Sequence, residues 1–392
     1  MGANSVKYLH SGMTGAPVLS GSVGALISVL DACLVDGFGL GTLDSLVIAS
    51  GVATATRASG HPFEAGQVVL IAGATVTGGT VNGEHRVLST TATTYTFDAT
   101  GISNQSATGT ITHKVSPVGW SKEFSGTNLA AYKSVDGSAT GFRLRVDDTG
   151  TYDARVVGYE TMSDVNTGTG PFPTSAQQSG GGYWVKSSTA SAAARSWILV
   201  ADERTFYLAV STDGTARYVV WGFGDLIAQG STDAYCAVLN YYNASGNGVP
   251  ISSIQPYSLL TANPASNTGI VMPRSYTGVG SSALARKWFS VMTGSTLSNL
   301  NSGGTADNGW PPYPNGSDGA LYVTPACVSQ DSDKSLRGTL PGLWPTPQYN
   351  VDASIASKDS VTSVAGLTGR ILKAAQCGGN GIGFFDITGP WR

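Results

Sequence analysis

The carboxylates that could form a catalytic pair lie at two places in the sequence. Asp147 and Asp148 are adjacent, and Asp331 and Asp333 are separated by one residue. Glycoside hydrolysis needs two carboxylates across the scissile bond, and closely spaced carboxylates can also hold Ca²⁺. The string Asp147-Asp148-Thr149-Gly150 is more typical of a turn, because aspartate bonds to nearby backbone amides, and no EF-hand spacing surrounds Asp331. We therefore predict no catalytic residue and no enzymatic activity.

Histidine and cysteine show no spacing that is typical of a metal or redox site. No two histidines lie within five residues, and no C-x-x-C pair is present. Three histidines fall in one β-rich region, which leaves a three-histidine site conceivable, although turn or surface positions are the default for His61, His85 and His113. We predict no bound metal and four reduced, mostly buried thiols at Cys33, Cys236, Cys327 and Cys377.

Cofactor motifs are also absent from the sequence. There is no G-x-S-x-G nucleophile elbow and no Walker A string. The run Gly379–Gly383 (GNGIG) is similar to the start of a dinucleotide-binding loop, but a strand is expected after it where that loop needs a helix. We therefore predict that the protein uses no cofactor.

Aromatic residues in loops are the remaining candidates for function. The chain from Asn243 to Asn315 is rich in Ser, Gly, Asn and Pro, and long irregular segments of this kind often form interaction surfaces. Aromatic side chains in such loops can anchor a protein interface, stack on a sugar ring or cover a small local core. We take as interface candidates four residues in or near this region: Trp288, Trp310, Tyr313 and Trp344.

Composition excludes several classes of protein. The 392 residues are 41% hydrophobic and only 12% charged, with 52 glycines and a net charge of −3. A chain this apolar is not disordered, and its weak charge gives no attraction to nucleic acid. The most apolar stretch, Val23–Val35, contains Ser28 and Asp31 and is too short to cross a bilayer, so we expect no membrane insertion.

The elements that must position these residues are mostly strands. Apolar residues at helical spacing predict one helix over about 21–34, within an N-terminal segment, 1–43, of the core domain. Residues 44–114 alternate with a period of two between turn signals, which predicts a small inserted β-barrel that folds on its own. Residues 115–392 form the main β-rich domain with long Gly/Ser/Pro loops, including strands over 197–201 and 205–210. The predicted fold class is mainly β: a β-sandwich or barrel-like core, one N-terminal helix and the small inserted barrel.

The sequence also resembles a known group of proteins. The opening KYLHSGMTGAPVLSGSVGALISVLDACLVDGFG and the closing segments LRGTLPGLW (Leu336–Trp344), GRILKAA (Gly369–Ala375) and FDITGPWR (Phe385–Arg392) are similar to tail-associated virion proteins of long-tailed bacteriophages and prophages. The block 44–114, with GHPF at Gly60–Phe63 and GQV at Gly66–Val68, resembles a small β module common in phage tail proteins. The resemblance implies a structural or adhesive part of a virion and assigns no active residue.

Composition and resemblance together predict a non-enzymatic structural component of a bacteriophage virion, placed in the tail or baseplate. Such a protein would assemble in the host cytoplasm and bind copies of itself, as a trimer or hexamer, and other virion proteins. The alternatives are a tail-tip protein that binds a host surface glycan or protein, and a head decoration or neck protein. In each case charge-poor, β-rich surfaces suit contacts from which water is excluded.

Overall fold

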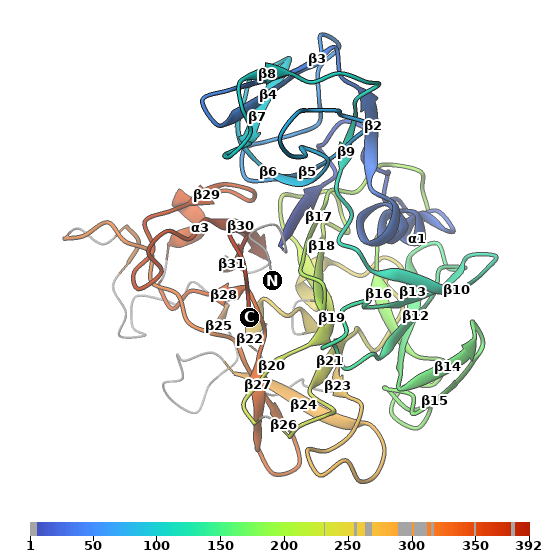
Figure 1. Cartoon of the computed structure of the whole chain (residues 1–392). Helices are drawn as coiled ribbons and strands as arrows, with labels where there is room; N and C mark the ends of the chain where they lie inside the picture. Colours follow the sequence, from blue (N-terminus) through green and yellow to red (C-terminus); the bar gives the residue numbers. More distant parts are fainter. Residues whose placement is uncertain are drawn as a thin grey trace.

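The computed structural model describes residues 6–230, 232–254, 257–262, 269–288, 300–301, 312–314, 317–348, 350–377 and 381–392. Over these residues the chain is mainly β with few, short helices, which confirms the predicted fold class. Figure 1 shows curved sheets gathered around the middle of the molecule, with a ring of strands at one end. The described residues form three parts: the central sheet, the sheets that flank it and the ring.

A ten-stranded antiparallel sheet forms the middle of the molecule. Its order is β1 (Lys7–His10), β17 (Trp197–Ala201), β18 (Thr205–Val210), β19 (Val219–Asp225), β21 (Ala237–Asn240), β23 (Ile270–Met272), β24 (Ala283–Trp288), β26 (Cys327–Gln330), β27 (Leu336–Thr339) and β20 (Ile227–Ala228). Strands β19 and β20 are consecutive in the chain and are joined at Leu226. Because the last strand of the sheet follows a central one, the strands between them curl into a barrel-like array.

Strands β17, β18 and β19 are apolar on both faces because both faces are covered. Phe206 and Trp221 belong to the largest hydrophobic core, whereas Tyr207 and Val220 on the opposite face belong to a second core. Full burial explains why these strands are continuous apolar runs in the sequence. The bounds predicted for β17 and β18 are confirmed.

Two smaller sheets flank the central one (Figure 1). The first has the order β10 (Ser121–Gly126), β11 (Leu129–Lys133), β12 (Arg143–Asp147), β13 (Asp153–Tyr159) and β16 (Gly182–Val185), with a ribbon of β14 (Thr161–Asp164) and β15 (Thr167–Thr169) beside it. It closes the largest core, where Trp184 meets Phe206 edge-on with ring centroids 5.9 Å apart.

The C-terminal sheet separates the second core from a third. Its order is β28 (Leu343–Pro345), β31 (Gly381–Asp386), β30 (Leu372–Cys377) and β29 (Ser360–Val361). Phe385 faces the second core, and its neighbour Phe384 faces the third. Short elements complete this region: α2 (Ile251–Ile254), α3 (Val351–Ser354) and the paired β22 (Thr261–Ala262) and β25 (Leu300–Asn301). Strand β28 is an edge strand and matters for the surface described below.

The ring of strands at one end of Figure 1 is a small barrel. Its order is β2 (Phe38–Thr42), β9 (Thr112–Val115), β5 (Val68–Ala72), β6 (Gly83–Thr90), β7 (Thr94–Asp98), β4 (Val52–Thr56), β3 (Ser45–Ala49) and β8 (Gln105–Ser106). The sheet closes because β2 and β3 follow one another and pair with β9 and β8, as Gly41 with His113 and Val47 with Ser106. The barrel therefore includes the range 44–114 and extends a few residues beyond it. Its independent folding stays a prediction.

Charged side chains hold the barrel against the rest of the molecule. Lys7 Nζ of β1 lies 2.5 Å from Glu84 Oε2 of β6, and His10 Nε2 lies 2.9 Å from Glu64 Oε1. The Arg86 guanidinium donates to the carbonyl of Ile387, near the C-terminus, at 2.9 Å. These contacts connect the barrel to both ends of the chain and fix its orientation on the core.

The N-terminal helix differs from its predicted bounds. Helix α1 spans Ala25–Leu30 and continues as a π-helical turn over Asp31–Asp36, whereas helical spacing predicted residues 21–34. Its first amides are capped from far away in the sequence: Leu26 and Ile27 donate to Asp148 Oδ2 at 2.7 and 3.1 Å. The helix begins where this buried carboxylate reaches it, which local spacing could not indicate.

The barrel interior contains a histidine that we expect to make the protein sensitive to acid. Burial, together with the charges of Arg57 and His61, lowers the pKa of His113 to about 4. The ring is fully buried, and its Nδ1 lies 2.9 Å from the Tyr95 hydroxyl. Below pH 6.5, the usual pKa of histidine, His113 is protonated in the unfolded chain but stays neutral in the folded barrel. The free energy of unfolding therefore falls as the pH drops. The stability that His113 contributes is fully lost once the pH is below about 4, and this loss amounts to roughly 3 kcal/mol.

The test is urea unfolding of the wild type and of His113→Phe at about pH 7 and about pH 5. We expect the wild type to lose more stability than the variant on acidification, because phenylalanine keeps the ring and removes the titrating group. Equal losses in the two proteins would contradict the role given to His113.

Candidate interaction surface

The aromatic residues predicted as interface candidates are not fully exposed. Trp288, at the end of β24, is half-buried and its Nε1 donates to Ser329 Oγ at 2.5 Å. Tyr313 and Trp344 are half-buried and pack against the third core. Trp310 lies outside the described residues. Tyr313 and Trp344 therefore pack against the same core, whereas Trp288 lies at the end of β24.

A groove of about 280 Å³ opens beside Trp344, where the edge strand β28 meets β20 and the C-terminus. We call it the Trp344 groove, and its lining is mostly apolar: Ile227, Pro325, Thr339, Leu340, Gly342, Leu343, Trp344, Leu367, Arg370, Asp386, Pro390 and Trp391. Ile227 of β20 is 38% exposed at its border. The groove can therefore accept an apolar side chain from outside the molecule.

The polar groups of the Trp344 groove bond to one another. Arg370 Nη1 donates to Asp386 Oδ2 at 3.0 Å and to the carbonyl of Gly389 at 3.1 Å. The Trp391 indole donates to the Asp386 carbonyl at 2.8 Å. In contrast, Trp344 Nε1 is buried and finds no acceptor in the described part of the chain. The groove thus combines apolar side chains with one ion pair, whose arginine is 34% exposed.

A second pocket of about 280 Å³ lies at the opposite end of β27 and differs in chemistry. We call it the Tyr276 pocket; its lining is Gln229, Gly230, Thr232, Asp233, Tyr276, Ser335, Leu336 and Arg337. Tyr276 is 54% exposed and Leu336 47% exposed, so two large side chains with apolar surface stand among lining residues that are otherwise polar or glycine.

Arg337 forms the floor of the Tyr276 pocket, and all five of its donors are used. Its Nε and Nη2 make a fork to Asp233 at 2.5 and 2.8 Å. The remaining donors bond to the carbonyls of Arg274 and Tyr235 and to Gln330 Oε1, at 3.0, 3.3 and 3.3 Å. With the guanidinium almost fully buried, this fork is fixed in place.

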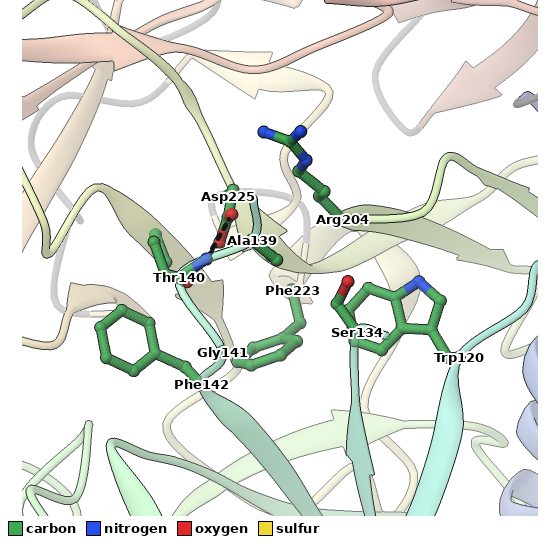
Figure 2. Close-up of a pocket in the computed structure, with 11 residues that line it drawn as sticks. Trp120, Ser134, Ala139, Thr140, Gly141, Phe142, Arg204, Phe223 and Asp225 are labelled. Atoms are coloured by element: carbon green, nitrogen blue, oxygen red, sulfur yellow. Dashed lines mark hydrogen bonds between the residues drawn. The ribbon is translucent and has the colours of Figure 1, made fainter. Parts of the chain in front are cut away.

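A third cavity, drawn in Figure 2, is too small for a substrate. It measures about 10 Å³, about the space of a single water molecule, and lies between Asp225 and the rings of Trp120 and Phe223. Both oxygens of Asp225 are occupied by Thr140, whose amide donates at 2.9 Å and whose hydroxyl donates at 2.5 Å. Burial raises the pKa of this carboxyl. The Ser134 hydroxyl also lines the cavity, but it donates to the Glu203 carbonyl at 2.5 Å rather than to Asp225.

The acidic residues considered for catalysis serve turns and ion pairs. Asp147 Oδ1 accepts from the amide and hydroxyl of Thr149, as the turn interpretation predicts. Asp148 differs, because it caps α1 and pairs with Lys186, and both side chains are fully buried. Asp331 pairs with Arg286 and Lys334, and Asp333 accepts from the Ser335 amide at 3.0 Å.

The three barrel histidines do not converge on one point. Each bonds to a different neighbour: His61 Nε2 to the Thr94 carbonyl, His85 Nε2 to the Val81 carbonyl and His113 Nδ1 to the Tyr95 hydroxyl. Within the described ranges, no cluster of three or more His, Cys, Asp or Glu residues is arranged to hold a metal ion. The described cysteines, Cys33, Cys236, Cys327 and Cys377, are free thiols.

Sequence reasoning missed the residues that shape both surfaces. Ile227 follows a buried strand without a visible change of pattern, and Tyr276 stands in a turn-rich segment, PRSYTGVG, whose pattern predicts only a loop. Arg337 and Asp233 are 104 residues apart, so their fork has no sequence signal. The one usable signal for the Tyr276 pocket was an aromatic residue within a turn-rich segment.

Comparisons with known proteins add no family to this description. None of the family models matches the chain, and none of the curated proteins matches it. Among the helices that the structure describes, none is both long and apolar enough to span a membrane.

Proposed function

We propose that the protein is a non-enzymatic structural component of a bacteriophage virion, in the tail or baseplate. It acts through contacts with neighbouring copies of itself and with other virion proteins. The observation that carries the proposal is the Trp344 groove, which presents rigid apolar surface at the edge of a sheet. We propose that an apolar side chain of a neighbouring copy occupies it.

Three properties of the groove support a protein occupant. Its charged residues, Arg370 and Asp386, pair with each other, so a partner that covers the groove buries no unpaired charge. Trp344 and Trp391 supply the large aromatic surface that dominates interface energetics. The unpaired Nε1 of Trp344 is a donor that a partner's carbonyl could satisfy after a small side-chain adjustment.

Replacing Ile227 with arginine should weaken self-association without unfolding the protein. The side chain is exposed at the border of the groove, so arginine fits the monomer but places an unpaired charge in the contact. We expect the dissociation constant to rise by about 30-fold or more, which corresponds to roughly 2 kcal/mol. Sedimentation velocity over a range of concentrations gives the oligomer mass, and a thermal melt checks the fold.

Val47→Arg is the matched control, because Val47 is 41% exposed but lies on the barrel, away from the groove. It should leave both mass and melting temperature unchanged. A wild type that stays monomeric at every concentration, or an Ile227→Arg variant with the wild-type mass, would contradict the proposed contact.

A further inference from the structure

We infer that the Tyr276 pocket is a binding site for one ring of a neutral sugar. This inference goes beyond the proposed structural function, since it involves a different surface and a different kind of ligand. It rests on the chemistry of the pocket: an exposed aromatic ring, free hydrogen-bonding side chains, a fixed floor and balanced charge.

The aromatic ring stands on a braced turn. The Tyr276 amide donates to Gln330 Oε1 at 3.3 Å, and Arg274 Nη1 donates to the Gly278 carbonyl at 3.0 Å. Arg274 is itself held by Glu160 through two bonds of 2.6 and 2.8 Å. The backbone under an exposed tyrosine is thus preorganised, and its flat apolar face is available for the C–H face of a sugar ring.

Two side chains beside the Tyr276 ring have hydrogen-bonding groups available for a ligand. The side chains of Gln229 and Thr232 are exposed and make no side-chain hydrogen bond within the described residues. An amide and a hydroxyl each donate and accept, as sugar hydroxyls do. Asp233 Oδ2 accepts from Arg337 Nε at 2.5 Å, and a carboxylate oxygen can accept from a second donor as well. The pocket can therefore bond to several hydroxyl groups at once.

Charge and size narrow the class of ligand. Asp233 is neutralised by Arg337, whose donors are all used, so no cationic group remains in the lining to recognise a carboxylate or phosphate. The nearby Asp331 is likewise paired with Arg286 and Lys334. A volume of about 280 Å³ lies at the small end of ligand pockets, which suits a single ring of a longer chain.

The test is saturation-transfer NMR of the full chain with four probes: methyl glucoside, methyl galactoside, N-acetylglucosamine and the anionic N-acetylneuraminic acid. We expect at least one neutral sugar to bind more tightly than the anionic one. Tyr276→Ala should weaken that binding about tenfold or more, roughly 1.4 kcal/mol, whereas Tyr276→Phe should retain it because the ring remains. Thr232→Val, which removes a hydroxyl and keeps the shape, should weaken it to a smaller extent.

Val279→Ala is the matched control, since Val279 is 74% exposed on the same turn but does not line the pocket. Absence of binding by all three neutral probes would overturn the inference, as would equal or tighter binding of N-acetylneuraminic acid or binding that Tyr276→Ala leaves unchanged. Tyr276→Ala should not alter the oligomer mass, so failure here is distinguishable from failure of the proposed self-association.

Discussion

Replacing Asp148 with alanine should destabilise the core by about 3–5 kcal/mol, because it leaves a buried ammonium without its carboxylate. Lys186 and Asp148 pair with both side chains fully buried, and the only other acceptor that Lys186 Nζ has in the described chain is the Ser22 carbonyl, at 2.7 Å. The same substitution removes the acceptor for the first amides of α1, at Leu26 and Ile27. Urea unfolding monitored by tryptophan fluorescence measures the loss.

The neighbouring carboxylate is the control. Asp147→Ala removes a turn contact to Thr149 and a partly exposed pair with Arg145, so it should cost less than about 1 kcal/mol. The double variant Asp148→Leu/Lys186→Met should be more stable than Asp148→Ala, because no charge is left buried. Equal stability of the Asp147→Ala and Asp148→Ala proteins would show that the buried pair does not stabilise the core.

Replacing Arg337 with leucine should be comparably severe, at about 3–5 kcal/mol. Five acceptor contacts are lost together, and Asp233 is left beside an apolar side chain. Because the Arg274 carbonyl is one of those acceptors, the turn that carries Tyr276 loses its anchor as well. We expect the variant to unfold at lower urea concentration and to lose any sugar binding by the Tyr276 pocket.

Arg286→Leu supplies the comparison for this second prediction. Arg286 is also a strand arginine in an ion pair, with Asp331, but both side chains are about a quarter exposed. Surface pairs contribute about 0–1 kcal/mol, and Asp331 retains Lys334, so we expect a small effect. If the two leucine variants unfolded at the same urea concentration, the fork of Arg337 would not be a major contributor to stability.

Strands were predictable from the sequence where burial is complete. The runs WILVA and TFYLAV gave the correct bounds of β17 and β18, because both faces of these strands are covered and every residue except Thr205 is apolar. The start of α1 was not predictable in the same way. Its capping group, Asp148, lies 122 residues beyond Leu26, and a local reading of spacing carries no information about a partner that distant.

Surface function was harder to predict than the fold. Tryptophan and proline in a Gly-rich segment signal an aromatic surface, but they do not say whether the ring points into a local core or outward. Tyr313 and Trp344 proved half-buried against the third core. Tyr276, the most exposed aromatic among the described residues of the region, had no distinguishing neighbour in the sequence. Exposure depends on packing between segments far apart in the chain, such as β20 and the C-terminus.

The barrel enters and leaves the core through a single pair of strands. Phe38 of β2 pairs with Val115 of β9, so the chain departs and returns at adjacent points. Seen from the core, the residues between Phe38 and Val115 form one long loop whose ends are adjacent. The entropy cost of closing a loop grows only slowly with its length. A different domain with neighbouring termini could therefore replace residues 38–115, provided that it also supplies a partner for Lys7, which is buried and pairs with Glu84 of the barrel.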